Sequence, residues 1–400
     1  MFKKKAFLLL SSEFLSKGTS FLSILIIANF FSKEIFGLLV LHFVAFELLT
    51  IVISNGITAS ARIDYFEKED VIFLKNYKAH LINSFFTSLV ILIIGVICFQ
   101  NHFIEIICLC LSAFLRTIFM LSLAVLQCKE LAQNYFKLNV FHTILYNSSF
   151  IIFISLGFTI IAWVYAIFIS YFFISLISFR FYLKDFKKHY NNLQLTDLKK
   201  QFFVGITFFP QNIGFWSRTG SERFYLSNLL SLSTLGVYSF NFQLSLPIVI
   251  FGNAINIYLT PIIAKKINQK KEKEIFRIIK IYTLLLTCMS FLNIFGAYII
   301  SRFFFYEKYF DSFHLNIWTA TINLFYVLML LFINPLYYLG RKKIVSNLIF
   351  IYGVFLSVSN FFVIKFYGLQ GLIIFNTLIN FFFLIFSYKL LVKSIYAIKN

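Results

Sequence analysis

Four basic side chains fall within or at the ends of long apolar segments: Lys17, Arg116, Arg218 and Arg223. A charge near the centre of a bilayer costs about 2.5–3.5 kcal/mol on insertion scales, so such groups usually face a partner or a wet cavity. Arginine and lysine bind phosphate and carboxylate groups, and arginine can do so through two parallel hydrogen bonds. The pattern predicts a cationic cavity for an anion such as a diphosphate or an acidic sugar.

Acidic residues in the same segments leave a second interpretation open. Glu13 precedes Lys17 by four residues, the favoured order for an ion pair along a helix. Glu222 adjoins an arginine, and Glu47 lies in the second apolar segment. Arg116 has no acidic neighbour one turn away, so its alternative is packing against an acidic residue of another segment. Ion pairing would then hold helices together instead of lining a cavity.

The elements that must position these residues are membrane helices. The chain has 400 residues, of which 60% are hydrophobic and 20% aromatic. The apolar runs are long and continuous, and about 20 apolar residues cross a bilayer as a helix. We therefore expect an all-α polytopic membrane protein with twelve spans. They lie roughly at residues 6–30, 36–58, 77–98, 103–127, 138–157, 160–182, 202–222, 235–258, 276–300, 312–334, 344–364 and 369–391.

The distribution of basic residues predicts the orientation. Most of the 36 lysine and arginine residues fall in alternate connections, which places both termini in the cytoplasm. These loops also account for the net charge of +20. They would lie against anionic lipid, and a nucleic-acid partner is not needed to explain them.

Two halves are expected: an N-terminal six-helix lobe (1–182), a cytoplasmic linker (183–201) and a C-terminal six-helix lobe (202–400). A short pattern, N-x-x-S-x-x-x-[FL]-G, recurs at Asn29–Gly37 and Asn228–Gly236. Transporters are commonly built from such repeats and hold the substrate between them. Pro210 and Pro247 fall inside expected spans, where each favours a kink.

Metal and redox chemistry have no support in the sequence. The five cysteines form no C-x-x-C pair, and the six histidines show no ligand spacing. We expect the cysteines to pack as apolar residues, and we expect no metal site and no cofactor.

Three stretches resemble a known family. They are NFFSKEIFGLLVLHFVAFELLTIVISNGITASARI, SERFYLSNLLSLSTLGVYSFNFQLS and NPLYYLGRKKIVSNLIFIYGVFLSVSN. Together they are similar to signatures of bacterial polysaccharide flippases of the O-antigen or capsule type. These flippases belong to the multidrug/oligosaccharidyl-lipid/polysaccharide exporter superfamily, which includes multidrug extruders of MATE type and the lipid II flippase.

The resemblance implies a function. The substrate would be an oligosaccharide on undecaprenyl diphosphate, turned across the bacterial inner membrane by alternating access for O-antigen and lipopolysaccharide synthesis. It also implies two six-helix lobes around a cationic cavity, with the cavity cations carried over to Lys17, Arg116, Arg218 and Arg223. We expect a monomer, and association with glycan-assembly proteins stays open.

Two other functions compete with this one. A cation or drug antiporter of the same fold would use carboxylates such as Glu13, Glu47 or Glu105 to exchange a cation for H⁺ or Na⁺, and Glu222 is a further possible coupling or ion-pair carboxylate. A membrane enzyme is disfavoured, because the longest external loop, about residues 301–311, is too short to build a catalytic site. The chain has no GxxxxGK[ST] loop for ATP, so an H⁺ or Na⁺ gradient is the expected energy source.

Overall fold

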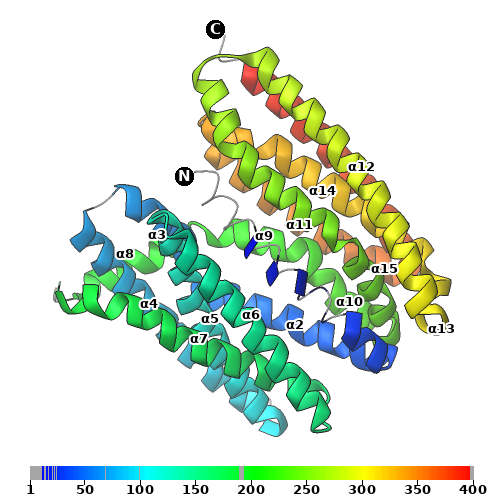
Figure 1. Ribbon diagram of the computed structural model, residues 1–400, viewed down its shortest axis with the longest axis horizontal. Helices are drawn as coiled ribbons and strands as arrows, with labels where there is room; N and C mark the ends of the chain where they lie inside the picture. The colour runs from blue at the N-terminus through cyan, green and yellow to red at the C-terminus, as the bar shows by residue number, and fades with distance from the viewer. Residues whose placement is uncertain are drawn as a thin grey trace. The chain divides into compact units, whose positions relative to one another are not determined.

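The computed structural model describes residues 11–12, 15–16, 18–19, 21, 23, 25–67, 69–98, 100–188 and 193–396. Within these residues the ordered elements are all helices (Figure 1). They are α2 (Lys33–Ser54), α3 (Ile57–Glu67), α4 (Asp70–Cys98), η1 (Gln100–His102), α5 (Phe103–Cys128), α6 (Ala132–Ser155), α7 (Ile160–Lys188), α8 (Leu195–Ile206), α9 (Phe209–Thr219), α10 (Ser221–Leu229), α11 (Leu232–Asn268), α12 (Glu272–Phe304), α13 (Tyr306–Tyr309), η2 (Phe310–Ser312), α14 (His314–Tyr338) and α15 (Lys342–Tyr396).

Nine of the described helices are long and apolar enough to cross a membrane. One of them, α15, contains two spans, because Gly368 interrupts it with φ 64° and ψ −154°, a conformation open to glycine. The expected seventh span is divided among α8, α9 and α10. The first expected span lies partly outside the described residues. The predicted all-α, polytopic fold class is confirmed.

Pro210 explains one break in the seventh span. It occupies the second position of α9, where a missing backbone N–H costs little because the first turn of a helix has no internal acceptor for it. The sequence predicted one kinked span over 202–222, and the chain instead starts a new helix there. By contrast, α11 continues as a helix through Pro247.

The chain forms two compact units. The first takes in the described residues of 1–20 and 42–216, and the second takes in those of 21–41 and 217–400. The unit boundary therefore falls later than the predicted linker at 183–201, and residues 21–41 join the second unit. The lobes at 1–182 and 202–400 stay a prediction.

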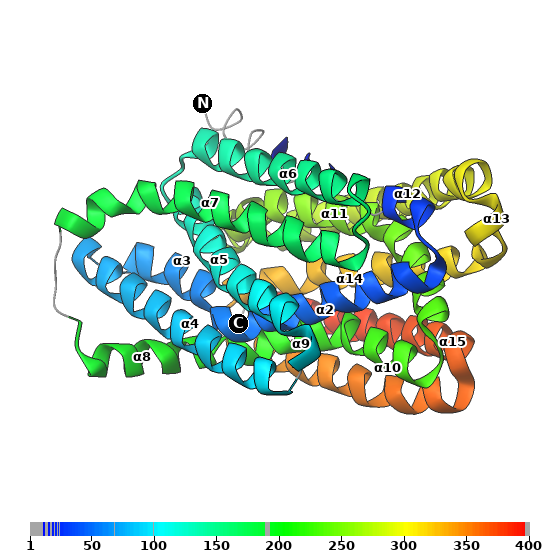
Figure 2. The ribbon, with the colours of Figure 1, turned by 90° about the horizontal axis from the view of Figure 1, so that it is seen from below.

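In the first unit, α5 packs against α3, α4 and α7, and α7 also packs against α6. The short helix α8 belongs here as well, beside α4 (Figure 2). Its attachment is polar: Asn83 Nδ2 donates to the Leu198 carbonyl at 2.8 Å, and Lys75 pairs with Asp197 at 2.7 Å. This docking explains why residues beyond the predicted linker belong to the first unit.

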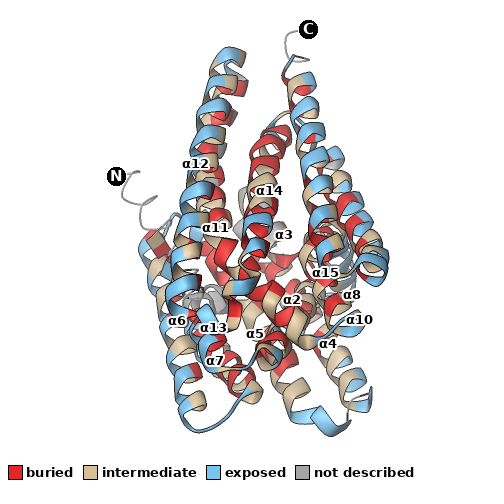
Figure 3. Ribbon diagram, turned by 90° about the vertical axis from the view of Figure 1, so that its right-hand side faces the viewer, coloured by how far each residue is buried: buried red, intermediate tan, exposed pale blue. Residues whose placement is uncertain are grey.

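In the second unit, α14 is the central helix. It packs against α11, α12 and α15, and most of its surface is buried, whereas α12 exposes much of its length (Figure 3). Asparagines on α14 bond to α11: Asn316 Nδ2 donates to the Asn241 carbonyl at 3.0 Å, and Asn323 Nδ2 donates to Ser245 Oγ at 2.7 Å. These buried bonds fix the register of the two helices.

Candidate functional site

The second unit contains a buried charged cluster made by the end of α9 and the start of α10. Arg218 lies in the last turn of α9, and Glu222 and Arg223 lie in the first turn of α10. The chain turns between them at Gly220, so three charged groups from adjoining helices come together. An acidic residue is also favoured in a first turn, where the helix dipole is positive.

Glu222 is the anchored member of the cluster. Glu222 is buried, with only 2% of its surface exposed. Tyr238 Oη, on α11, donates to Oε1 at 2.7 Å, and Asn376 Nδ2, on α15, donates to Oε2 at 2.9 Å. Both carboxylate oxygens thus accept a hydrogen bond from another helix. These two bonds offset part of the free-energy cost of burying the group.

The two arginines make aromatic contacts. The Arg218 guanidinium carbon lies 3.7 Å from the centroid of the Tyr326 ring, and that of Arg223 lies 5.0 Å from the Phe242 ring. Among the described residues, neither buried Nε atom has a hydrogen-bond partner. Two guanidinium groups accompany one carboxylate that is already bonded to neutral donors, so the cluster keeps an excess of positive charge.

A second charged pair lies in the first unit. Arg116, on α5, meets Glu47, on α2, through two contacts: Nη1 to Oε1 at 2.7 Å and Nη2 to Oε2 at 3.1 Å. The side chains are 17% and 30% exposed, so this is a bidentate and mostly buried ion pair. The guanidinium also lies 5.3 Å from the Phe46 ring centroid.

The predicted site residues thus belong to two different units. Arg218, Glu222 and Arg223 come together in the second unit, whereas Arg116 packs against an acidic residue of another span, the alternative that the sequence left open. Lys17 and Glu13 lie outside the described residues, and so does their predicted ion pair. The substrate-binding roles stay predictions.

Sequence reasoning missed the neutral members of the cluster. Tyr238 and Asn376 hold Glu222, and Tyr326 contacts Arg218. The only signal was the polar character of Asn376 within a long apolar run, since Tyr238 and Tyr326 are common in this chain.

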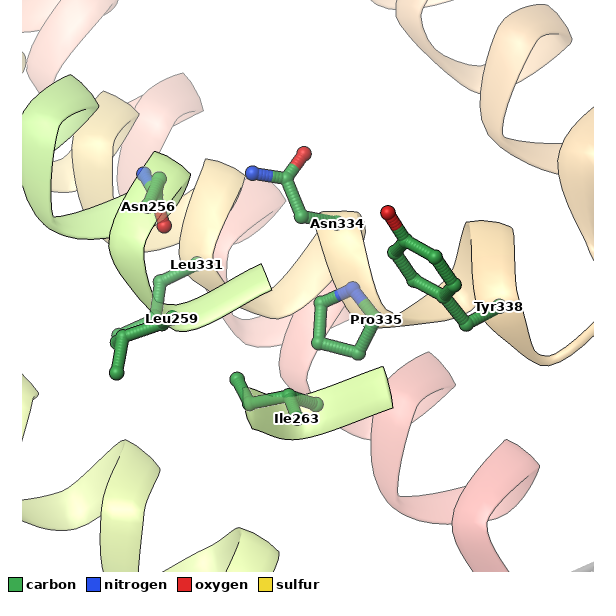
Figure 4. A pocket seen from close by; sticks show the side chains of 7 residues that line it. All are labelled: Asn256, Leu259, Ile263, Leu331, Asn334, Pro335 and Tyr338. Atoms are coloured by element: carbon green, nitrogen blue, oxygen red, sulfur yellow. The ribbon is translucent and has the colours of Figure 1, made fainter. Parts of the chain in front are cut away.

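Two other features of the described residues bear on a possible site: a small cavity and the arrangement of metal-binding side chains. A cavity of about 10 Å³ lies between α11 and α14 (Figure 4). That volume suits about one water molecule and no substrate. Within the part of the chain that the structure describes, no group of three His, Cys, Asp or Glu side chains could hold a metal ion. The cavity is lined by Asn256, Leu259, Ile263, Leu331, Asn334, Pro335 and Tyr338.

The fold is that of a transporter class. A MATE-family multidrug resistance transporter of the MOP superfamily, inward-facing, superposes with a TM-score of 0.76 at 15% identity, over 98% of this chain and 99% of that one. An outward-facing one gives 0.70 at 17% identity, over 99% and 96%. A MOP-superfamily transporter from Pyrococcus furiosus, described as having a binding pocket of reverse polarity that suggests a different function, gives 0.69 at 15%, over 100% and 97%.

The sequence identifies the family within this class. Residues 26–314 match the polysaccharide biosynthesis protein family, Polysacc_synt_3. The chain therefore belongs to that family, and its family and fold are those of a multi-pass membrane transporter. A comparison with curated proteins found no match. The resemblance seen in the sequence is confirmed at this level.

Proposed function

We propose that this protein is a flippase that translocates an undecaprenyl-diphosphate-linked oligosaccharide across the bacterial inner membrane by alternating access. The observation that carries the proposal is the cluster of Arg218, Glu222 and Arg223, which keeps an excess of positive charge inside an apolar unit. A diphosphate headgroup is an anion that would need such a site within the membrane. Membership of the polysaccharide biosynthesis family supports a glycan cargo.

In this mechanism the two arginines replace water around the diphosphate. A guanidinium group offers five N–H donors in a planar fork that matches phosphate oxygens. Glu222 has a positioning role: its bonds to Tyr238 and Asn376 tie α10 to α11 and α15. Among the described residues, the buried Nε atoms of Arg218 and Arg223 have no hydrogen-bond partner, so in this mechanism both guanidinium groups keep donors for the diphosphate.

The same proposal covers the cellular setting. We place the protein in the inner membrane with both termini in the cytoplasm, in O-antigen or capsule synthesis and so in the production of lipopolysaccharide or a related glycan. We expect a monomer energised by an H⁺ or Na⁺ gradient. Neighbouring genes for glycosyltransferases would support this setting, and a deletion strain should retain lipid-linked glycan on the cytoplasmic face.

The direct test uses purified protein in proteoliposomes that contain a lipid-linked oligosaccharide. Each hydrogen bond to a charged group is worth about 1.5–3 kcal/mol, so Arg218→Gln or Arg223→Gln should slow flipping by about 10- to 100-fold. Arg302→Gln is the matched control, because Arg302 is exposed at the end of α12 and bonds only to Tyr298 Oη at 2.7 Å among the contacts described. Wild-type flipping by a folded Arg218→Gln/Arg223→Gln variant would refute the proposed site.

A cation or drug antiporter is the second candidate, because two of the similar structures are multidrug resistance transporters. That function needs a carboxylate that exchanges a cation, and Glu222 is the buried carboxylate of the second unit. An antiporter should confer drug resistance on a sensitive strain, and Glu222→Gln should abolish the resistance. A flippase should confer no drug resistance, whether position 222 is glutamate or glutamine.

A further inference from the structure

The repeated pattern N-x-x-S-x-x-x-[FL]-G has the same local structure in both copies. In the first copy, the backbone N–H of Ile35 donates to Ser32 Oγ at 3.3 Å, at the start of α2. In the second copy, the backbone N–H of Thr234 donates to Ser231 Oγ at 3.0 Å, at the start of α11. The serine is thus a helix N-cap in each case, and the glycine follows within the second turn.

The two glycines meet each other's helices. A Cβ atom on Gly37 would overlap the carbonyl oxygen of Leu232, four residues before Gly236. A Cβ atom on Gly236 would overlap the carbonyl oxygen of Lys33, four residues before Gly37. The contact is therefore reciprocal: the backbones of α2 and α11 lie so close together that neither glycine could carry a side chain. A crossing of this kind requires glycine at both positions, which accounts for the glycine in each copy of the pattern.

A second contact holds the same segment. Lys308, in α13, donates to the carbonyl oxygens of Asn29 and of Phe31, the latter at 3.2 Å. These carbonyl oxygens lie at and just after the end of the helix that precedes α2, where no following helical turn supplies an N–H donor. The ammonium group of Lys33 also lies 5.9 Å from the Tyr309 ring centroid. All of these residues belong to the second unit.

The segment held in this way comes from the N-terminal half of the chain. Helix α2 runs without a break from Lys33 to Ser54, but it belongs to the second unit only through Leu41 and to the first unit from His42. The attachment combines the glycine backbone contacts, the bonds of Lys308 and apolar packing, since Phe36 is only 1% exposed and Leu41 packs against the core cluster that contains Leu235. Because α2 is part of both units, a movement of one unit against the other must separate these contacts or bend α2.

We propose that the glycine crossing and Lys308 form a releasable latch. The latch holds residues 29–37 on the second unit in the state seen here, and it separates when the transporter changes access. It lies at the end of the helices that the charge pattern predicts to face outward, so its release would open the outer side. This inference rests on the alternating-access transport proposed above and adds the residues that must part during the cycle.

The test measures the distance across the latch. Spin labels are attached at Asn29→Cys and Asn228→Cys, both exposed positions, in a protein whose five native cysteines are replaced by alanine. Double electron–electron resonance in lipid nanodiscs should show a short and a long distance. Gly37→Ala should reduce the short-distance population by at least about tenfold, because the added methyl group excludes the crossing.

Two further variants guard the interpretation. Gly296→Ala, on α12, is the matched control, since a Cβ atom there meets nothing within 4 Å. It should leave both populations unchanged. Lys308→Met removes the second contact without touching the packed glycines, and it should move the populations in the same direction as Gly37→Ala. A single distance in the parent protein, or no shift in either variant, would overturn the latch.

A second experiment distinguishes failure of the latch from failure of the proposed substrate. Crosslinking the same two cysteines with a reductant-cleavable thiol reagent should stop flipping of a lipid-linked oligosaccharide, and cleavage should restore it. If the two distances are present but no oligosaccharide is flipped, the latch stands and the proposed substrate falls. If flipping continues at the normal rate with the crosslink intact, the latch falls and the proposed function stands.

Discussion

The ion pair between Arg116 and Glu47 allows a stability effect to be separated from a transport effect. Glu47→Gln removes the negative charge and keeps the shape, so the guanidinium is left without its counter-charge. Breaking a fully buried pair costs about 3–5 kcal/mol, and the partial exposure of 17% and 30% reduces our expectation to about 2 kcal/mol. That corresponds to about a 30-fold fall in the folding equilibrium constant.

The assay is a double-mutant cycle on the free energy of unfolding in detergent or bicelles. Arg116→Met alone leaves Glu47 without its partner and should also destabilise. The double variant removes both charges and should recover most of the loss. Glu105→Gln is the control, because Glu105 pairs with exposed His102 at 3.3 Å and should contribute little. Additivity of the two single variants within about 0.5 kcal/mol would refute the pairing.

The double variant also tests whether Arg116 binds substrate. If Arg116 serves only to hold α5 against α2, a stable Glu47→Gln/Arg116→Met protein should flip lipid-linked oligosaccharide at close to the wild-type rate. If Arg116 contacts the diphosphate as the sequence predicted, the double variant should be folded and slow. Measured stability and measured flipping in one protein therefore distinguish the two interpretations.

Two other perturbations follow from single contacts. Tyr238→Phe removes the 2.7 Å donor to buried Glu222 and should cost about 1–3 kcal/mol in the free energy of unfolding, while an unchanged value would contradict the anchoring role. The bond from Lys75 lowers the pKa of Asp197 below 3.8, so its stabilisation is present above pH 3.8 and is lost as pH falls through the lower, folded-state pKa. The protection factors of the α8 amides, which correct for the intrinsic exchange rate at each pH, should therefore fall in acid, and Lys75→Met should remove most of that pH dependence.

The fold was largely predictable because each membrane helix is signalled locally. A long apolar run specifies a span without reference to its neighbours, whereas the orientation that the alternating basic loops indicate stays a prediction. Pro210 marked one of the places where a helix restarts, although it did not predict that α8 would pack against α4. That outcome depends on Asn83 and Lys75, which lie far away in sequence.

The partners of the charged groups were not predictable in the same way. Glu47 and Arg116 stand on different helices, and no spacing rule connects residues so far apart. The same holds for Glu222 and Asn376, which are joined by a hydrogen bond at 2.9 Å. A sequence shows which charged residues are costly to bury. Only the fold shows which neighbouring side chain forms the ion pair or hydrogen bond that stabilises each of them.

This difference in partners ranks the predicted cations by how much of their positive charge is available to bind an anion. Arg116 has a carboxylate to itself, with both of its oxygens engaged, so little of its charge is left for a ligand. Arg218 and Arg223 share one carboxylate whose oxygens already accept bonds from Tyr238 and Asn376. We therefore expect the second unit to hold the anion. In the flipping assay, neutralising Arg218 or Arg223 should then cost more than neutralising Arg116 together with its partner.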